Sequence, residues 1–376
     1  MPAPTTGNAP ICSELSAHAG DAAFDSGPVL LACIAAAPEH GAVNLPVGVY
    51  YLHNPITITK AVALQTAGTS ESAATVCDPR NHACATLKAS PTATTLQPDD
   101  PTMFLLTIRA EGGSLNHIVL DMSSRVQGLL LDGKDWHIMR NGFTGARHTS
   151  YFNSPNATGT VIVQNFAVNN GVRAGHAFSD GFTIKDGKNL VVEDNVFWDN
   201  TDVPLIFGGC RACSVRRNTI TQSGDANRGS FAALAIYTWE DSSGDYTGTT
   251  FSGNHIDCNA QCGFGEYIGS YSWNGGPPIT GGTIDGETIV NAQIGIYIDH
   301  AVGTTVTDNN GITAPTGGQW TSSCGKTYGP TVLAMAVDPA PNQIIQIGIG
   351  ATAPNLFNNH KKIIDLRKCI PNFGGM

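Results

Sequence analysis

Four carboxylates in the middle of the chain could exchange protons with a bound substrate if the fold brings two of them together. They are Asp180, Asp202, Glu240 and Glu266. Two carboxyl groups that flank one bond can divide the work, one staying protonated as a general acid and the other ionised as a base or nucleophile. Because the four lie tens of residues apart, only a repeating architecture would make neighbours of them.

Glu266 belongs to a strand-like run, 263–267, that aligns with 293–297, where the same position holds Ile296. An inward carboxylate would lose its hydration and its pKa would rise, as a general acid requires. The alternative is a local bulge that turns Glu266 outward. Glu240 begins the loop one repeat earlier, and carboxylates on strands one or two spacings apart would be separated by about 5 or 10 Å. Those separations suit retaining and inverting glycosidases respectively.

Charged residues also gather at the turn before this strand in three successive repeats. They are Arg173, His176 and Asp180, then Asp199 and Asp202, then Asp225 and Arg228. Aspartates at turns commonly accept hydrogen bonds from their own backbone, which is one interpretation. The other is an acidic pocket of Asp180, Asp199 and Asp202 that supplies an acid–base pair or binds Ca²⁺.

Aromatic residues recur on the strand that follows this turn. Tyr237, Tyr267 and Tyr297 are spaced 30 residues apart, so aligned repeats predict one outward column, which also contains Asp132, Lys185 and Gly208. Stacked tyrosines can serve stability alone, or can form a platform for sugar rings. The loops that follow hold Trp239 and Trp273, and exposed tryptophans favour the platform. The candidate substrate-binding residues are Tyr237, Trp239, Tyr267, Trp273, Lys185, His176, Arg228 and Asp299.

The element that must position these side chains is a repeat that ends a short β-rich run in asparagine, with an apolar residue two positions later. The clear copies end at Asn141, Asn195, Asn218 and Asn254, and weaker ones at Asn116, Asn165, Glu287 and Asn310. Spacings of 23 to 36 residues are typical of solenoids. Alternating Val, Ile, Thr and Phe indicate strands, so the repeat predicts an all-β, right-handed parallel β-helix of three-strand coils. Asparagine suits a coil corner because it tolerates left-handed backbone and can bond its amide to the next coil.

The N-terminal region adds a cap. A Gly20-Asp21 segment precedes a short apolar helix at 28–37, and a strand of the form G-x-V-x-L-P-x-G-x-Y follows from Gly41 to Tyr50. This arrangement resembles the N-terminal cap of the pectate-lyase-like β-helix superfamily, which includes polysaccharide lyases, glycoside hydrolases, uronan epimerases and phage tailspikes. The resemblance implies the fold. It carries over no catalytic residues, because the polygalacturonase, epimerase and pectin methylesterase motifs are absent.

Four segments are expected along the chain: an N-terminal segment and cap (1–65), an inserted loop (66–102), the β-helix coils (103–312) and a C-terminal cap folded back on the last coils (313–376). A net charge of −10 and the absence of a basic run exclude nucleic acid as a partner. The longest apolar run, 29–37, is too short to span a membrane.

Ten cysteines point to an oxidising compartment, since most lie close to a plausible partner. The expected pairs are Cys12–Cys33, Cys77–Cys84, Cys210–Cys213, Cys258–Cys262 and Cys324–Cys369. The alternative for Cys210 and Cys213 is half a zinc site or a redox motif, but no second cysteine pair or nearby Cys/His pair supports it. The sequence begins without a signal peptide, as a mature secreted protein would.

The leading hypothesis is a secreted polysaccharide-active enzyme, a glycoside hydrolase that uses two carboxylates. The second is a polysaccharide lyase or uronan epimerase, in which Lys185, Arg228 or His176 abstracts a proton and the acidic pocket holds Ca²⁺, the one cofactor considered. It ranks second because the acidic chain disfavours a polyanionic substrate unless calcium bridges it. The third is a non-catalytic, tailspike-like glycan-binding β-helix that could form a homo-oligomer.

Overall fold

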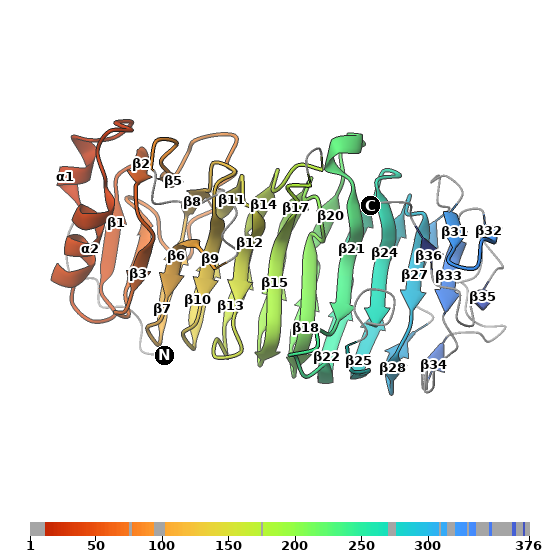
Figure 1. The fold of residues 1–376 in the computed structure, drawn as a ribbon. Coiled ribbons are helices and arrows are strands. Elements are labelled where there is room, and N and C mark those ends of the chain that lie inside the picture. Colours follow the sequence, from red (N-terminus) through yellow and green to blue (C-terminus); the bar gives the residue numbers. More distant parts are fainter. Residues whose placement is uncertain are drawn as a thin grey trace.

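The computed structural model describes residues 12–74, 77–93, 102–173, 176–269, 276–307, 310–313, 320–328, 331–335, 346–347, 363–365 and 371–372. Within them the chain winds into a long stack of coils, which lie side by side in Figure 1. The strands of these coils form three parallel sheets. Successive strands of one coil enter sheets A, B and C in turn. The predicted right-handed parallel β-helix is therefore confirmed.

Each sheet receives one strand from nearly every coil. Sheet A contains β1 (Ala42–Leu45), β4 (Ala63–Thr66), β7 (Gly113–Asn116), β10 (Trp136–Met139), β13 (Val161–Val163), β16 (Val191–Glu193), β19 (Ser214–Arg216), β22 (Asp245–Ser252), β25 (Ile279–Asp285), β29 (Thr305–Val306), β34 (Gln346–Ile347) and β28 (Ala301–Val302), which pairs with β25. Sheet B contains β2 (Val49–Leu52), β5 (Ala85–Ala89), β8 (Ile118–Asp121), β11 (Gly142–Thr144), β14 (Phe166–Val168), β17 (Val196–Trp198), β20 (Thr219–Thr221), β23 (His255–Asp257), β26 (Thr288–Val290) and β30 (Gly311–Thr313). Sheet C contains β3 (Ile56–Ile58), β6 (Phe104–Ile108), β9 (Gln127–Leu131), β12 (His148–Asn153), β15 (Ser179–Lys188), β18 (Leu205–Arg211), β21 (Ser230–Tyr237), β24 (Cys262–Gly269), β27 (Ile294–Ile298), β33 (Thr331–Met335) and β35 (Ile363–Asp365).

The repeated asparagines form a buried ladder along the corner between sheets A and B. The Asn195 amide nitrogen donates to Ile162 O and Asn218 Oδ1, both at 2.9 Å, and its backbone N–H donates to the same Asn218 oxygen at 3.1 Å. Glu287 continues the ladder by accepting from Asn254 Nδ2 at 2.8 Å. The predicted bonding between coils is thus present.

The expectation of left-handed backbone at these asparagines is corrected, because the residue before the asparagine takes that conformation at several corners. Arg140, Asp194 and Arg217 have φ of 55°, 56° and 55°. The residue before the asparagine therefore makes the bend between sheets A and B, and the asparagine backbone bonds to the neighbouring coil.

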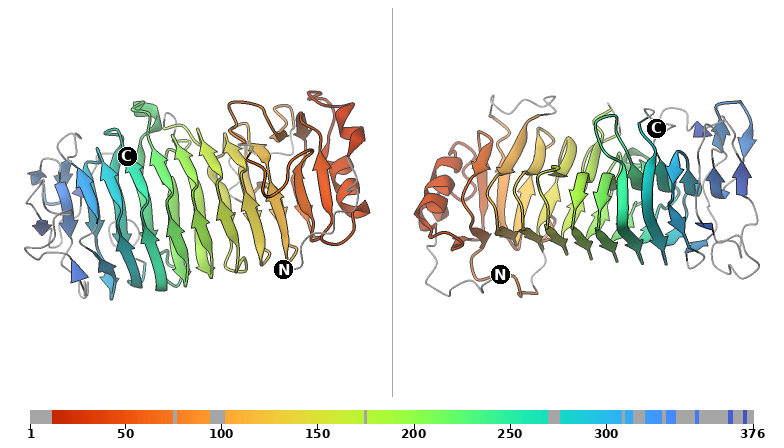
Figure 2. Two further views of the ribbon diagram at one scale, coloured as in Figure 1. Left: turned by 180° about the vertical axis from the view of Figure 1, so that it is seen from behind. Right: turned by 90° about the horizontal axis from the view of Figure 1, so that it is seen from below.

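Two helices close the first coil, at the red end of the ribbon in Figures 1 and 2. They are α1 (Ser13–Ser16) and α2 (Gly27–Ala36). The predicted cap helix is α2, whose first turn contains a proline and whose Gly27 N–H donates to Asp25 Oδ1 at 3.0 Å. Leu30 and Ile34 are buried against the core, so the helix covers the apolar end of the coil.

The coil region extends beyond the predicted limits of 103 and 312. Coils begin at β1, and β5 lies inside the segment predicted as an inserted loop. At the other end β33, β34 and β35 still pair in parallel with the sheets. A small antiparallel sheet, β31 (Trp320–Ser322), β32 (Thr327–Tyr328) and β36 (Pro371–Asn372), accompanies these last strands.

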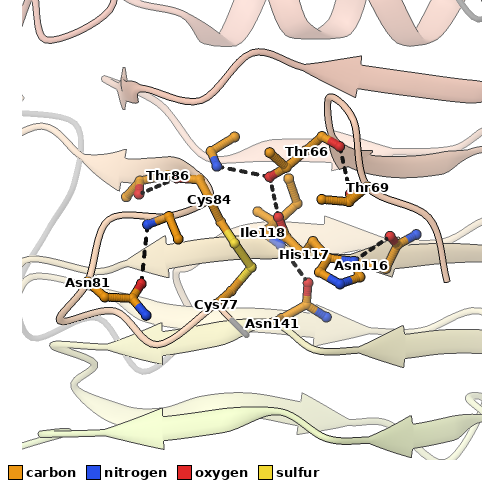
Figure 3. The surroundings of a disulfide bond; sticks show 12 residues. Thr66, Thr69, Cys77, Asn81, Cys84, Thr86, Asn116, His117, Ile118 and Asn141 are labelled. Atoms are coloured by element: carbon orange, nitrogen blue, oxygen red, sulfur yellow. Dashed lines mark hydrogen bonds between the residues drawn. A yellow bond between two sulfur atoms is a disulfide. The ribbon is translucent and has the colours of Figure 1, made fainter. Parts of the chain in front are cut away.

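Disulfides join four of the expected pairs: Cys12–Cys33, Cys77–Cys84, Cys210–Cys213 and Cys258–Cys262. Cys324 is also disulfide-bonded, and its predicted partner, Cys369, lies outside the described residues. Figure 3 shows the Cys77–Cys84 bond beside the ladder residue Asn141 and beside Asn116, which is in register with Met139 and does not continue the ladder. Among the described residues, no helix is long and apolar enough to cross a bilayer.

Candidate active site

A cavity of about 370 Å³ lies at the edge of sheet C where β12, β15 and β18 begin. Ligand pockets in proteins measure about 300–1,000 Å³, so the cavity is large enough for a small ligand or one end of a larger one. It is lined by Arg147, His148, His176, Ala177, Phe178, Asp180, Asp202, Ile206 and Trp239. Of the four predicted carboxylates, two line this cavity.

Asp180 is the second residue of β15 and is held by the coil that follows it. Its Oδ2 accepts from Thr183 Oγ1 at 2.8 Å, and its Oδ1 accepts from the Val203 N–H at 3.2 Å. Thr183 Oγ1 also contacts Thr149 Oγ1 at 2.9 Å, which links the site to β12. Burial, and secondarily the charge of Asp202, raises the pKa of Asp180 well above its ordinary value despite these two hydrogen bonds.

Asp202 lies in the turn that precedes β18, one coil further along. Its backbone N–H donates to Ser179 O at 3.2 Å, and its backbone oxygen accepts from the Phe231 N–H at 2.9 Å. The residue is thus fixed to the coils on both sides. Burial raises the pKa of Asp202 to about 6. The two carboxyl groups titrate as a pair, in which Asp180 retains the proton and Asp202 ionises first.

Basic side chains form part of the rim of the cavity. His148 and His176 are exposed, and Arg147 is half-buried. The His148 N–H donates to Phe178 O at 3.1 Å, which ties the start of β12 to the segment before β15. The cavity lining thus combines two acids with three basic side chains, which supply both a proton source and groups that can bind hydroxyls or an anion.

Trp239 forms one wall of the cavity, and its position explains Gly208. A Cβ at Gly208 would lie 1.8 Å from Cζ3 of the Trp239 ring, so the indole rests directly on the backbone of β18. The turn after Trp239 is tied to the C-terminal part of β15. Lys185 Nζ lies 2.5 Å from Asp241 Oδ2, and Asp186 Oδ1 accepts from the Ser243 N–H at 2.8 Å.

The other two predicted carboxylates lie outside the cavity. Glu240 is exposed on the turn after Trp239. Glu266 is fully buried, pairs in register with Leu234 and Ile296, and points into the coil interior. The predicted inward position is correct and there is no bulge at this point. A side chain inside the coil cannot touch a polysaccharide, so the catalytic assignment of Glu266 is corrected to a core position.

The tyrosines are close together, but they do not form one exposed column. Tyr267 is in register with Tyr297, whereas Tyr237 is opposite Gly269 and Tyr267 is opposite Ala235. The ring centroids of Tyr237 and Tyr267 are 5.9 Å apart, and those of Tyr267 and Tyr297 are 5.5 Å apart. All three side chains are fully buried. The exposed tyrosine platform is therefore corrected to a covered cluster.

The remaining binding candidates have other contacts. Asp299 is buried and accepts from Tyr267 Oη at 3.0 Å. Arg228 donates to Gly171 O, while Lys185 pairs with Asp241. Trp273 lies outside the described residues. His176 and Trp239 are the members of the predicted binding set that line the cavity.

Asp199 does not line the cavity. Its backbone is left-handed, with φ of 53°, and its Oδ1 accepts from the Ser223 N–H at 2.7 Å. Ser223 belongs to the next coil, so Asp199 joins neighbouring coils and does not make the hydrogen bond to its own turn that was one of the two interpretations. Within the described part of the chain no group of three or more His, Cys, Asp or Glu side chains is arranged to hold a metal ion.

The cavity is also lined by residues that were not predicted from the sequence: Arg147, His148, Phe178 and Ile206. Arg147 immediately precedes β12 of sheet C and His148 is its first residue, at the same edge as Asp180. That position was the available signal, because strand starts of adjacent coils lie side by side in a parallel sheet.

Comparisons with known proteins identify the fold. No protein-family model matches the chain, and no curated protein sequence matches it. A Geobacillus virus E2 protein, ORF18, superposes with a TM-score of 0.54 at 14% identity, over 87% of this chain and 62% of its own. Pectate lyase Pel9A superposes with a TM-score of 0.53 at 13% identity, over 85% of this chain and 76% of its own. The Streptococcus pneumoniae surface protein and adhesin PfbA superposes with a TM-score of 0.52 at 12% identity, over 81% of this chain and 91% of its own.

An enzyme, an adhesin and a viral protein share this architecture, so the likeness establishes the fold and leaves function to the site. The chain has the right-handed parallel β-helix fold, which it shares with pectate lyase Pel9A.

Proposed function

We propose that this chain is a polysaccharide-active enzyme that hydrolyses a glycosidic bond, with Asp180 as the general acid and Asp202 as its ionised partner. The observation that carries the proposal is the pair itself. Two carboxyl groups from adjacent coils line one cavity, and burial gives both a raised pKa. Near neutral pH the pair holds one proton, which is the state that glycoside hydrolysis requires.

In the proposed reaction the Asp180 proton passes to the glycosidic oxygen as the bond to the anomeric carbon breaks. Asp202 either takes a proton from the attacking water or itself forms the bond to the anomeric carbon, which water then hydrolyses. Asp180 is well placed to hold its proton because burial and the Asp202 charge both disfavour ionisation. The Thr183 and Val203 hydrogen bonds fix the direction of the carboxyl group.

The rest of the cavity suits a sugar. Trp239 and Phe178 provide aromatic surface on which the C–H face of a pyranose ring can pack. Arg147, His148 and His176 supply polar groups for hydroxyls at the rim. Polysaccharide substrates are commonly extracellular, and four disulfides fit an oxidising compartment, so we also propose that the protein is secreted.

A polysaccharide lyase or uronan epimerase is the second candidate, and the basic rim favours it. Arg147 could neutralise a uronate carboxylate, and His148 or His176 could remove the proton α to it. In that reaction Asp180 and Asp202 would bind the sugar or contribute to a Ca²⁺ site completed by the substrate.

Incubation with a panel of neutral and uronate-containing polysaccharides separates these reactions. Hydrolysis gives new reducing ends without ultraviolet absorbance, whereas β-elimination gives an unsaturated product that absorbs. We expect Asp180→Asn and Asp202→Asn each to reduce hydrolysis at least 100-fold with the fold retained. Glu240→Gln is the matched control, because Glu240 is exposed and outside the cavity. Full activity in both asparagine variants would reject the assignment.

A further inference from the structure

The outer face of sheet C carries a second apolar cluster beside the cavity, which we call the outer aromatic cluster. It consists of Val203, Ile206, Ala232, Ala235, Tyr237, Phe264, Tyr267, Ile294 and Tyr297, all buried. In a β-helix, outward side chains are normally open to solvent, so burial here means that other parts of the chain cover the face. Phe231, Trp239 and Tyr328 pack against the cluster as partly buried side chains.

The cavity and the outer aromatic cluster share a wall. Ile206 and Trp239 line the cavity and also belong to, or pack against, the cluster. The Tyr237 and Trp239 rings meet edge to face, with centroids 5.5 Å apart. The strip of sheet C that continues past Trp239 toward the C-terminal coils is therefore filled with protein side chains.

The covering extends to the C-terminal part of the chain. Tyr328 belongs to β32 of the small antiparallel sheet, far along the sequence from the cavity, and it packs on the same cluster. In Figure 1 this sheet lies at the blue end of the stack, on the C-terminal side of β21, β24 and β27. A polymer lying along sheet C would meet this filled surface on one side of the cavity.

The wall of the cavity at Trp239 is stabilised by contacts with several strands. Two of these contacts are the Lys185–Asp241 pair and the Asp186–Ser243 hydrogen bond described above. In addition, Tyr246 Oη accepts from the Gly209 N–H at 2.9 Å and from the Tyr237 N–H at 3.0 Å. The first two contacts join the loop after Trp239 to β15, and the Tyr246 hydrogen bonds join the start of β22 to β18 and β21. His148 and His176, which also line the cavity, are exposed, whereas Trp239 is partly buried and packs against the outer aromatic cluster. The cavity is therefore bounded by packed side chains at Trp239.

We propose that the cavity is blind at Trp239 and accepts the terminus of a glycan chain, so that the enzyme removes residues from a chain end and does not cut within the chain. Trp239 is the specificity-determining residue, because its ring occupies the path that the next sugar of a continuing chain would take. The proposal rests on the proposed function for its substrate class. It adds that the substrate is bound by one end.

Product lengths test the proposal, whichever way the bond is broken. Wild-type protein should release a single short product size from a cleavable polysaccharide, and viscosity should fall slowly relative to the bonds broken. Trp239→Ala should give mixed product lengths, and at least a tenfold larger viscosity loss per bond. Trp239→Phe should keep the wild-type pattern because it keeps an aromatic wall. Trp198→Ala is the matched control, since Trp198 is a partly buried tryptophan on sheet B, stacked under Arg80.

A binding experiment tests the closed wall without turnover. Short oligomers of the same polysaccharide are titrated into the Asp180→Asn protein. One set is uncapped, and the other carries a bulky fluorescent group at both ends. Capping should weaken binding at least tenfold, and Trp239→Ala should remove that difference. Equal binding of capped and uncapped oligomers, or mixed product lengths from the wild type, would overturn the blind cavity. A wild type that binds uncapped oligomers selectively but breaks no bond would overturn the proposed hydrolysis and leave the blind cavity supported.

Discussion

Replacing Glu266 by leucine should stabilise the protein, and the gain should grow as the pH rises. Glu266 is fully buried between the register partners Leu234 and Ile296, and neither of its carboxyl oxygens has a hydrogen-bond partner among the described residues. Burial raises the pKa of Glu266 to about 8 from an ordinary value of 4.5. The neighbouring Glu287, also buried, has its pKa raised well above the ordinary value by burial and by Glu266.

The sign of the effect follows from proton binding. Between pH 4.5 and about 8 the folded protein keeps a proton on Glu266 that the unfolded chain has lost. The free energy of unfolding therefore decreases as the pH rises through this window. One pH unit corresponds to about 1.4 kcal/mol, so the whole window costs about 5 kcal/mol. Below the window only the unpaired neutral carboxyl group is costly, by about 1–3 kcal/mol.

Urea unfolding of wild type and Glu266→Leu from pH 5 to pH 9 measures this difference. The free energy of unfolding of the variant should exceed that of the wild type by about 2–4 kcal/mol at pH 5 and by about 6–8 kcal/mol at pH 9. Glu240→Leu serves as the control, because Glu240 is exposed on a turn and should show no such dependence. Parallel stability curves for wild type and Glu266→Leu would refute the argument that a buried, protonated carboxyl group lies inside the coil.

Three further predictions concern the site and the coil. The pH profile of kcat/KM should rise through about pH 6 as Asp202 ionises and fall at higher pH as Asp180 loses its proton; a profile flat from pH 5 to 7 would contradict the assigned pair. Gly208→Ala should displace the Trp239 ring and lower stability by about 1–3 kcal/mol while raising KM, as thermal unfolding and initial rates would reveal; unchanged kinetics would show that the ring does not form the wall. Asn195→Ala should lower the free energy of unfolding, measured by chemical denaturation, by about 2–5 kcal/mol, because the Ile162 carbonyl and the Asn165 N–H both lose a buried hydrogen-bond partner. A decrease below about 1 kcal/mol would mean that the ladder is not a stabilising feature.

The amino-acid sequence by itself determined the coil architecture. The asparagine repeat predicted the buried ladder because a corner that bonds to the coils on either side needs the same side chain in each. The cap helix and four disulfides could also be predicted, since each depends on residues close together in the sequence. These features are local or strictly periodic, so a linear pattern contains them.

Only the tertiary structure decided which side chains share a surface. The 30-residue spacing of the tyrosines predicted one column, but the chain between β21 and β24 sets a register in which Tyr237 is opposite Gly269. The tyrosines are buried because segments distant in sequence, such as the one containing Tyr328, pack over an outward face. The meeting of Asp180 and Asp202 with Arg147 and His148 likewise depends on how three successive coils align at one edge. The register of neighbouring strands depends on loop length, and the covering of an outer face depends on long-range packing. The period of a sequence repeat encodes neither of them.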